Sequence, residues 1–229
     1  MFEIDDNLDL YANVKVAYSG NISDYVGNES FEGVDFISVD GKSNDEINEV
    51  LKGADMVFII AGAQTSSVAE AAKEIGALTI AFVDEEIESK AIDTFFVISD
   101  SDKAIIPRII KAIADLIAVP GLVNLDFADV KSILGNAGRA YAGAGEAQET
   151  ANAVKAAINN VSDNISSSRS LLLNIIGATE GLSMMEVSVA SMAVQEASHE
   201  DAEIIWGVSI DESLGDKIIA TIIITNFAE

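Results

Sequence analysis

Three nearly unbroken apolar runs in the first hundred residues constrain the fold of this chain more than any other feature. They are Met56–Gly62 (MVFIIAG), Leu78–Val83 (LTIAFV) and Thr94–Ser99 (TFFVIS). Runs of this length without polar alternation are typical of strands that are buried on both faces of a parallel sheet. Because stretches with helical periodicity separate them, the runs predict a doubly wound parallel α/β layer.

The other elements of this layer are shorter. Two further strands are expected at Val14–Gly20 (VKVAYSG) and Asp35–Asp40 (DFISVD). Helices are expected from the Ser43 cap to Leu51, over Val68–Ile75, and over the acidic segment Glu85–Ala91. Residues 1–101 are therefore predicted to form a reduced Rossmann-like domain.

A long helical pattern follows at Asp102–Val119. Isoleucine and leucine recur along it in a wide apolar stripe, which predicts a helix that is buried on most sides. Pro107 suits a first turn better than a helix interior, and Pro120 with Gly121 ends the pattern. We interpret residues 102–119 as a central connecting helix.

The second half of the chain, residues 120–229, changes rhythm and predicts an α+β domain. Its expected helices are Asp126–Leu134, Thr150–Ile158 and Met184–Ala197, and its expected strands are Arg139–Ala144, Ser170–Ile176, Ile204–Ile210 and Lys217–Phe227. The last two strands are joined by the short polar connection Asp211–Asp216 (DESLGD), whose length and glycine predict a hairpin.

Charge and composition exclude several classes of function. The 38 acidic and 13 basic residues give a net charge of −25, which disfavours binding to nucleic acid or to an anionic membrane surface. There is no cysteine, and His199 is the single histidine, so no metal site is predicted. No apolar run approaches the roughly 18 residues of a membrane span, so we expect no membrane insertion and a cytoplasmic location.

The stretch Pro120–Lys131 (PGLVNLDFADVK) carries the residues with the clearest chemical potential. Asp126 and Asp129 lie three residues apart, and Asn124 precedes them. An amide and two carboxylates at a helix N-terminus can orient a water molecule or bind a cation. The same spacing is equally typical of a well-capped helix, so both interpretations remain open.

Several strings of this chain coincide with those of a known family. They are GADMVFIIAG (residues 53–62), VAEAAKEIGALTIAFV (68–83), IADLIAVPGLVNLDFADVKSILGNAGRAYAGAG (113–145) and the closing pair of strands. On these residues the chain resembles FtsZ, the bacterial and archaeal relative of tubulin. The resemblance implies a tubulin/FtsZ-like fold. It also implies that Asn124, Asp126 and Asp129 stand in the catalytic loop that acts on the GTP of a neighbouring subunit.

The same comparison predicts that the nucleotide-binding loops are degenerate. In the family, the strand equivalent to Met56–Gly62 runs into a glycine-rich phosphate loop, but here AQTSS takes its place. The segment expected after Asp35–Asp40 is cut to a few residues, and the guanine-binding pattern is missing near Asp102–Ala104. The candidate nucleotide-binding residues that remain are Gly20, Asn21, Gly62, Thr65 and Ser66.

Three functions are consistent with these observations. The first is an FtsZ-like cytoskeletal or cell-division protein that holds no cofactor, is not an efficient GTPase on its own, and modulates filaments of FtsZ-like subunits, either copies of itself or a true FtsZ. The second is a genuine polymerising GTPase that binds GTP with Mg²⁺. The third is an α/β protein that binds a small molecule at the carboxyl ends of its strands.

Overall fold

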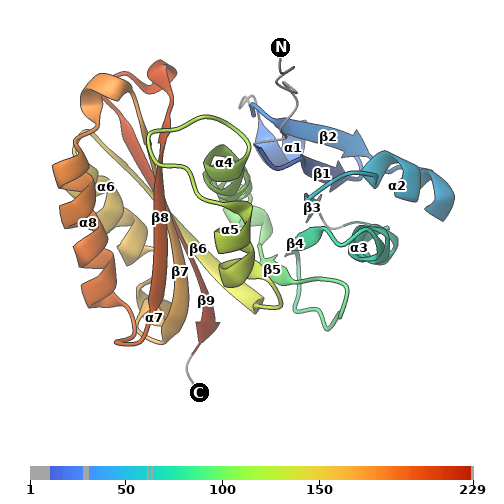
Figure 1. Ribbon diagram of the computed structural model, residues 1–229. Helices are drawn as coiled ribbons and strands as arrows, with labels where there is room; N and C mark the ends of the chain where they lie inside the picture. The colour runs from blue at the N-terminus through green and yellow to red at the C-terminus, as the bar shows by residue number, and fades with distance from the viewer. Residues whose placement is uncertain (1–10, 28–30, 61, 63, 228–229) are drawn as a thin grey trace, which may run out of the picture.

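The computed structural model describes residues 11–27, 31–60, 62 and 64–227. Their strands form one continuous sheet in the order β2-β1-β3-β4-β5-β6-β9-β7-β8, with helices on both of its faces (Figure 1). The strands of the first half are β1 (Val14–Tyr18), β2 (Val34–Ser38), β3 (Met56–Ile60), β4 (Leu78–Val83) and β5 (Thr94–Val97). Each pairs in parallel with its neighbours, so the predicted parallel α/β layer is confirmed.

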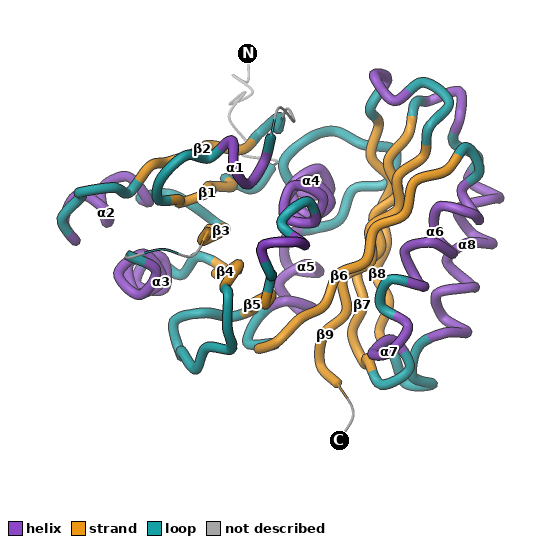
Figure 2. The backbone as a smooth tube through the Cα atoms, turned by 180° about the vertical axis from the view of Figure 1, so that it is seen from behind, coloured by secondary structure: helices purple, strands orange, loops and turns teal. Residues whose placement is uncertain are grey.

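Alternate side chains of the parallel strands fill two separate cores. Val57 and Ile59 of β3 pack toward α2 (Asn44–Leu51) and α3 (Thr65–Glu74). Phe58 and Ile60 point to the opposite face and pack toward α4 (Ile105–Ile117), which Figure 2 shows between the two halves of the molecule. Every residue of β3 is buried, which explains why this strand lacks polar alternation.

The central helix α4 is shorter than the pattern at residues 102–119 predicts. Asp100–Asp102 forms a short 3-10 turn, and the helix begins at Ile105. Pro107 therefore lies in its first turn, where a missing N–H costs nothing. Most of the helix is buried, as predicted, because the sheet curves around it.

The second half of the chain adds four strands to the same continuous sheet and packs four helices against it. The strands are β6 (Gly138–Ala147), β7 (Ser168–Gly177), β8 (Glu203–Ile210) and β9 (Ile218–Phe227). The helices are α5 (Phe127–Leu134), α6 (Thr150–Asn159), α7 (Ser162–Ile165) and α8 (Met184–Ala197). Helix α6 lies directly on β6, and the two are so close that a Cβ on Gly145 would lie 2.1 Å from the Ala153 carbonyl oxygen. Glycine is therefore needed there for helix packing.

The predicted hairpin at residues 211–216 is wrong. Strand β9 pairs antiparallel with β6 and β7, whereas β8 pairs in parallel with β7 at the margin of the sheet. The connection crosses the end of β7, where the Asp211 N–H donates to the Gly177 carbonyl oxygen at 3.0 Å. The physical reason is burial: β9 is buried from Ile218 to Thr225 and needs a strand on each side.

The predicted helix at Glu85–Ala91 is also absent, because this segment forms an irregular connection between β4 and β5. Glutamates stand at three of its seven positions, and Ile87 is its only large apolar residue. A helix here would gather like charges without an apolar stripe to bury. The Thr79 hydroxyl instead holds the segment: its one hydrogen is shared between the Ala91 carbonyl oxygen at 2.8 Å and the Asp93 carboxylate at 2.9 Å.

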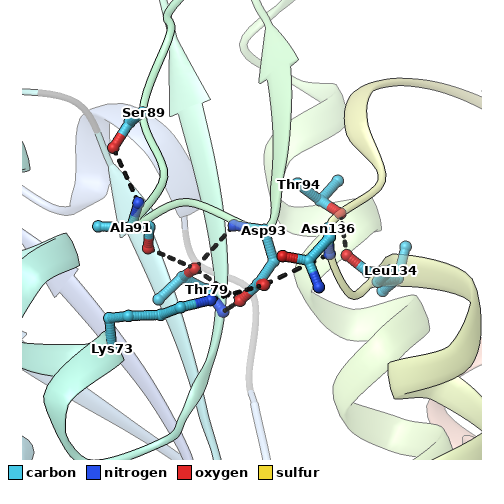
Figure 3. Close-up of polar contacts among 8 residues, drawn as sticks. All are labelled: Lys73, Thr79, Ser89, Ala91, Asp93, Thr94, Leu134 and Asn136. Carbon is cyan, nitrogen blue, oxygen red and sulfur yellow. Dashed lines mark hydrogen bonds and ion pairs between the residues drawn. The ribbon is translucent and has the colours of Figure 1, made fainter.

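The buried carboxylate of Asp93 joins the two halves of the molecule (Figure 3). The residue is 5% exposed, and its carboxylate accepts hydrogen bonds from the Thr79 N–H and hydroxyl, both at 2.9 Å. It also accepts from Lys73 of α3 and from the Asn136 N–H, which precedes β6, both at 3.3 Å. Burial raises the pKa of Asp93, but the Thr79 and Lys73 hydrogen bonds outweigh burial and leave the pKa lowered.

No helix among the described residues is long and apolar enough to cross a membrane.

Candidate functional site

The loop between α4 and α5 contains all three candidate catalytic residues. Asn124 uses its whole side-chain amide to fix this loop. Its Oδ1 accepts from the Gly121 N–H at 2.8 Å, and its Nδ2 donates to the carbonyl oxygens of Val119 at 2.7 Å and Leu116 at 3.3 Å. These carbonyls lie at the C-terminus of α4, so Asn124 caps that helix.

Asp126 caps the next helix. It is the N-cap residue of α5, with extended backbone, and its Oδ1 accepts from the Ala128 N–H at 2.9 Å. Asp129 lies in the first turn of the same helix, and both carboxylates are exposed. The capped-helix interpretation is therefore confirmed for Asp126, and the arrangement still presents two carboxylates to solvent.

The loop is held rigidly against the edge of the sheet. The N–H groups of Leu122 and Val123 donate to the Val208 carbonyl oxygen at 2.9 and 3.2 Å, and the Val208 N–H donates back to Val123 at 3.0 Å. A Cβ on Gly207 would lie 2.7 Å from the Val123 carbonyl oxygen of the loop, so glycine permits this close approach of the two backbones. The exposed carboxylates therefore lie next to a loop that both the end of α4 and strand β8 hold in position.

The five candidate nucleotide-binding residues lie at the opposite edge of the parallel layer, where β1 and β3 end. The chain runs outward to β2 on one side of this point and to β4 on the other, so it is a topological switch point. Ligands of open α/β sheets bind in the crevice at such a point. The structure thus brings Gly20, Asn21, Gly62, Thr65 and Ser66 to one edge.

The polar groups of the first loop are used within the loop and its neighbours. The Gly20 N–H donates to Asp40 Oδ2 at 2.8 Å. Asn21 accepts from the Ser23 N–H at 3.3 Å through Oδ1 and donates to Asp24 Oδ1 at 3.2 Å. A carboxylate therefore holds the backbone donor that a phosphate would need.

The second loop is closed in a similar way. The Gly62 N–H donates to Thr65 Oγ1 at 2.9 Å, and the Thr65 hydroxyl donates to the Gly62 carbonyl oxygen at 2.9 Å. Gly62 also lies so near the first loop that a Cβ on it would be 3.0 Å from Ser19 Cβ. Ser66 is exposed in the first turn of α3. Ala61 and Ala63 of this loop lie outside the described residues.

A small cavity lies next to this edge, between the ends of β3, β4 and β5 and the start of α4. The cavity there has a volume of about 20 Å³ and is lined in part by Tyr25, Asp84 and Lys103. Small-molecule sites usually measure roughly 300–1,000 Å³. Lys103 Nζ lies 5.1 Å from the centre of the Tyr25 ring and 2.7 Å from Asp100 Oδ1. The hydrogen bond to Asp100 raises the pKa of Lys103, so this cation is already paired.

Two larger cavities lie elsewhere. One, of about 840 Å³, is at the amino ends of the parallel strands, and Asp35, Asp55 and Asp126 contribute to its lining. The other, of about 770 Å³, lies between α4 and the β8–β9 connection. In the described part of the chain, no group of three or more histidine or acidic side chains is arranged to hold a metal ion.

The second cavity contains a charged group that the sequence analysis missed. Lys111 Nζ lies 2.9 Å from Asp115 Oδ2 and 3.5 Å from Asp211 Oδ2. Burial raises the pKa of Asp115 and outweighs the lowering effect of Lys111. The signal was visible in the sequence, because Lys111 and Asp115 are an i, i+4 pair inside an apolar helix.

Comparison with known proteins gives matches over both halves of the chain. Residues 138–228 match the family model for the C-terminal domain of the FtsZ family. The W319Y mutant of FtsZ from M. jannaschii is 22% identical over 95% of this chain and 92% of that chain, with a TM-score of 0.79. The empty FtsZ dimer from M. jannaschii is 23% identical over 94% and 88%, with a TM-score of 0.78. GDP-form protofilaments of TubZ from Bacillus thuringiensis serovar israelensis give 9% identity over 95% and 88%, with a TM-score of 0.60.

Proposed function

This chain has the FtsZ/tubulin fold with an FtsZ-type C-terminal domain, and from that premise we propose that it modulates filaments of FtsZ-like subunits in the cytoplasm without binding a nucleotide of its own. The solved relatives include a dimer and protofilaments, so the chain is proposed to associate with a subunit of its own fold. It would offer the catalytic-loop face to that subunit and lack a working nucleotide face.

The bonding of two loop N–H groups at the carboxyl ends of β1 and β3 carries this proposal. Phosphate binding needs free backbone N–H groups at a loop and helix N-terminus. Here the Gly20 N–H is bonded to the Asp40 carboxylate and the Gly62 N–H to Thr65. A phosphate at Gly20 would displace or face a carboxylate, in a protein of net charge −25.

The opposite face supports the second part of the proposal. Asn124 and the Val123–Val208 bridge hold the loop in place, and Asp126 and Asp129 are exposed on it. By its resemblance to FtsZ, this loop would face the nucleotide of the adjoining subunit. A subunit that docks in this way and presents no nucleotide in turn would stop growth at that end of a filament.

A second candidate is a polymerising GTPase whose loops rearrange on nucleotide binding. One observation favours it: α3 has no side-chain cap at its N-terminus, and Ser66 is exposed there. Such an N-terminus accepts anions, and Gly20, Asn21, Gly62 and Thr65 would then have to exchange their present hydrogen bonds for contacts to GTP and Mg²⁺. The small-molecule candidate has no comparable support, because the loops at the carboxyl ends of β1 and β3 bond their own polar groups.

An assembly assay tests the proposal. An active FtsZ is polymerised with GTP in the presence of increasing amounts of this protein, and filament length and GTP turnover are measured. We expect shorter filaments and a changed turnover at less than equimolar addition. The double variant Asp126→Ala, Asp129→Ser should lose much of this effect, whereas Glu85→Ala, an exposed carboxylate distant from the loop, should keep it. Unchanged filaments at equimolar wild-type protein would refute the proposal.

A further inference from the structure

Strand β8 leaves part of its edge without a partner. It pairs with β7 on one side, and on the other side only Val208 is covered, by the bridge to Val123. Every second residue of a strand directs its N–H and C=O to the same edge, so Ile204 and Trp206 direct theirs to the same side as Val208. Nothing in the described part of the chain hydrogen-bonds these outward groups. They are a template for a further strand.

A groove of about 270 Å³ runs beside this open edge. It is lined by Ser191 and Gln195 of α8 and by Ala202, Ile204 and Trp206. Its floor is therefore apolar next to the strand and polar next to the helix. A groove beside an unpaired strand can receive alternate side chains of an added strand while the backbones pair.

Helix α8 continues this surface outward. Val187, Ala190 and Val194 are buried on the sheet, yet the outer face is also apolar. Met185 is 78% exposed, and Val189 and Met192 are each 53% exposed, at i, i+4 and i+7. Figures 1 and 2 show no other element over this side of α8. Helices that are apolar on both faces are usually covered on both, so this face indicates a missing partner.

The charge around the groove indicates the chemistry of the partner. Residues 184–206 contain five carboxylates and neither lysine nor arginine. Glu196, Glu200, Asp201 and Glu203 are all exposed at the end of the groove where β8 begins. A second copy would bring the same carboxylates together, and residues 1–10 of this chain carry only acidic charges. Both occupants are therefore disfavoured relative to a basic segment.

We propose that the open edge of β8 binds an extended basic segment of another protein, which adds to the sheet antiparallel to β8. The antiparallel direction is chosen because the Val123–Val208 bridge on the same edge of β8 is itself antiparallel. Apolar side chains of the segment enter the groove beside Trp206, and its lysine or arginine side chains face Glu200 and Glu203. This site goes beyond the proposed action on an FtsZ-like subunit and does not depend on it.

The test uses the fluorescence of Trp206, the only tryptophan in the chain. A synthetic peptide that alternates lysine with valine or isoleucine is titrated into the full-length protein. We expect a saturable change in Trp206 emission and selective shifts of the Ile204 and Trp206 amide resonances. The same peptide with alternate residues N-methylated keeps its charge but cannot pair on one edge, so it should bind at least about tenfold more weakly.

Two variants separate groove binding from adsorption to an acidic protein. Ser191→Tyr fills the groove from an intermediate-exposure helix position and should weaken binding by about tenfold, and its circular dichroism and melting curve report whether it stays folded. Glu85→Lys/Glu88→Lys changes charge at a distant exposed loop and should have little effect. Equal binding of the N-methylated peptide, or equal weakening by the distant variant, would overturn the proposal. So would a concentration-dependent dimer that buries Trp206 without any peptide.

Discussion

Replacing Asp93 by asparagine should uncouple the two halves of the molecule more than any single surface change. In the native protein one carboxylate oxygen accepts both Thr79 bonds, and the other accepts from Lys73 and the Asn136 N–H. An asparagine can keep one acceptor oxygen, but its NH₂ group must then face two donors. The Asn136 N–H would lose its acceptor, and Lys73 would lose its counter-ion.

The expected magnitude follows from the number and kind of these bonds. Hydrogen bonds to a charged group contribute about 1.5–3 kcal/mol each, and the bond from half-exposed Lys73 contributes less because of solvent screening. We therefore expect Asp93→Asn to lower the free energy of unfolding by about 3 kcal/mol at pH 7. Lys73→Met is the matched control and should lower it by at most about 1 kcal/mol.

Urea unfolding followed by two probes provides the assay. Circular dichroism reports on both halves, whereas the fluorescence of Trp206 reports on the second half only. The wild-type transitions should coincide, and those of Asp93→Asn should shift to lower urea and separate. The folded pKa of Asp93 is lowered, so its contribution is present above the unfolded pKa of about 3.9 and is lost as the pH falls through the folded pKa. A free energy of unfolding for Asp93→Asn within about 0.5 kcal/mol of the wild-type value at pH 7 would refute this account of the junction.

Three further predictions concern other positions. Gly145→Ala should lower the free energy of unfolding by about 1–3 kcal/mol, because its Cβ would lie 2.1 Å from the Ala153 carbonyl oxygen, whereas Gly181→Ala, whose nearest neighbour is 3.9 Å away, should change it little in the same urea experiment. Asn124→Ala should cost about 1–2 kcal/mol and speed limited proteolysis between residues 118 and 126, since the Val119 carbonyl and the Gly121 N–H lose their side-chain partner; proteolysis at the wild-type rate would contradict the capping role. Lys111→Met should cost about 3 kcal/mol at neutral pH by leaving Asp115 buried without its cation, and the deficit should shrink as the pH falls through the raised pKa of Asp115; a deficit that does not vary with pH would show that this carboxylate is not its source.

The sequence predicted the parallel layer well because burial on both faces leaves a direct trace. The runs at Met56–Gly62 and Leu78–Val83 became β3 and β4, and the predicted Ser43 cap forms a complete capping box with Glu46. Strand order was less accessible. Nearness along the chain favoured a hairpin of β8 and β9, whereas the burial of β9 demanded a neighbour on each side.

The place of the candidate loop residues in the fold was predicted more closely than their contacts, and their role as a site stays a prediction. The loop residues Asn124 and Asp126 stand where the sequence placed them, but their helix-capping bonds depend on how α4 ends and α5 begins. The bonding of the loop N–H groups depends on contacts between residues far apart in the chain, such as Gly20 with Asp40. No local pattern encodes such contacts, so the missing glycines were the only available signal.

A nucleotide titration tests the central claim most directly. Purified full-length protein is titrated with fluorescent GTP in the presence of Mg²⁺, with an active FtsZ as the positive control and the variant Asp40→Ser as a probe of the loop that holds Gly20. The account predicts no saturable binding in the micromolar range for the wild type, because the Gly20 and Gly62 N–H groups are already bonded. Saturable micromolar binding that unlabelled GTP displaces would contradict it.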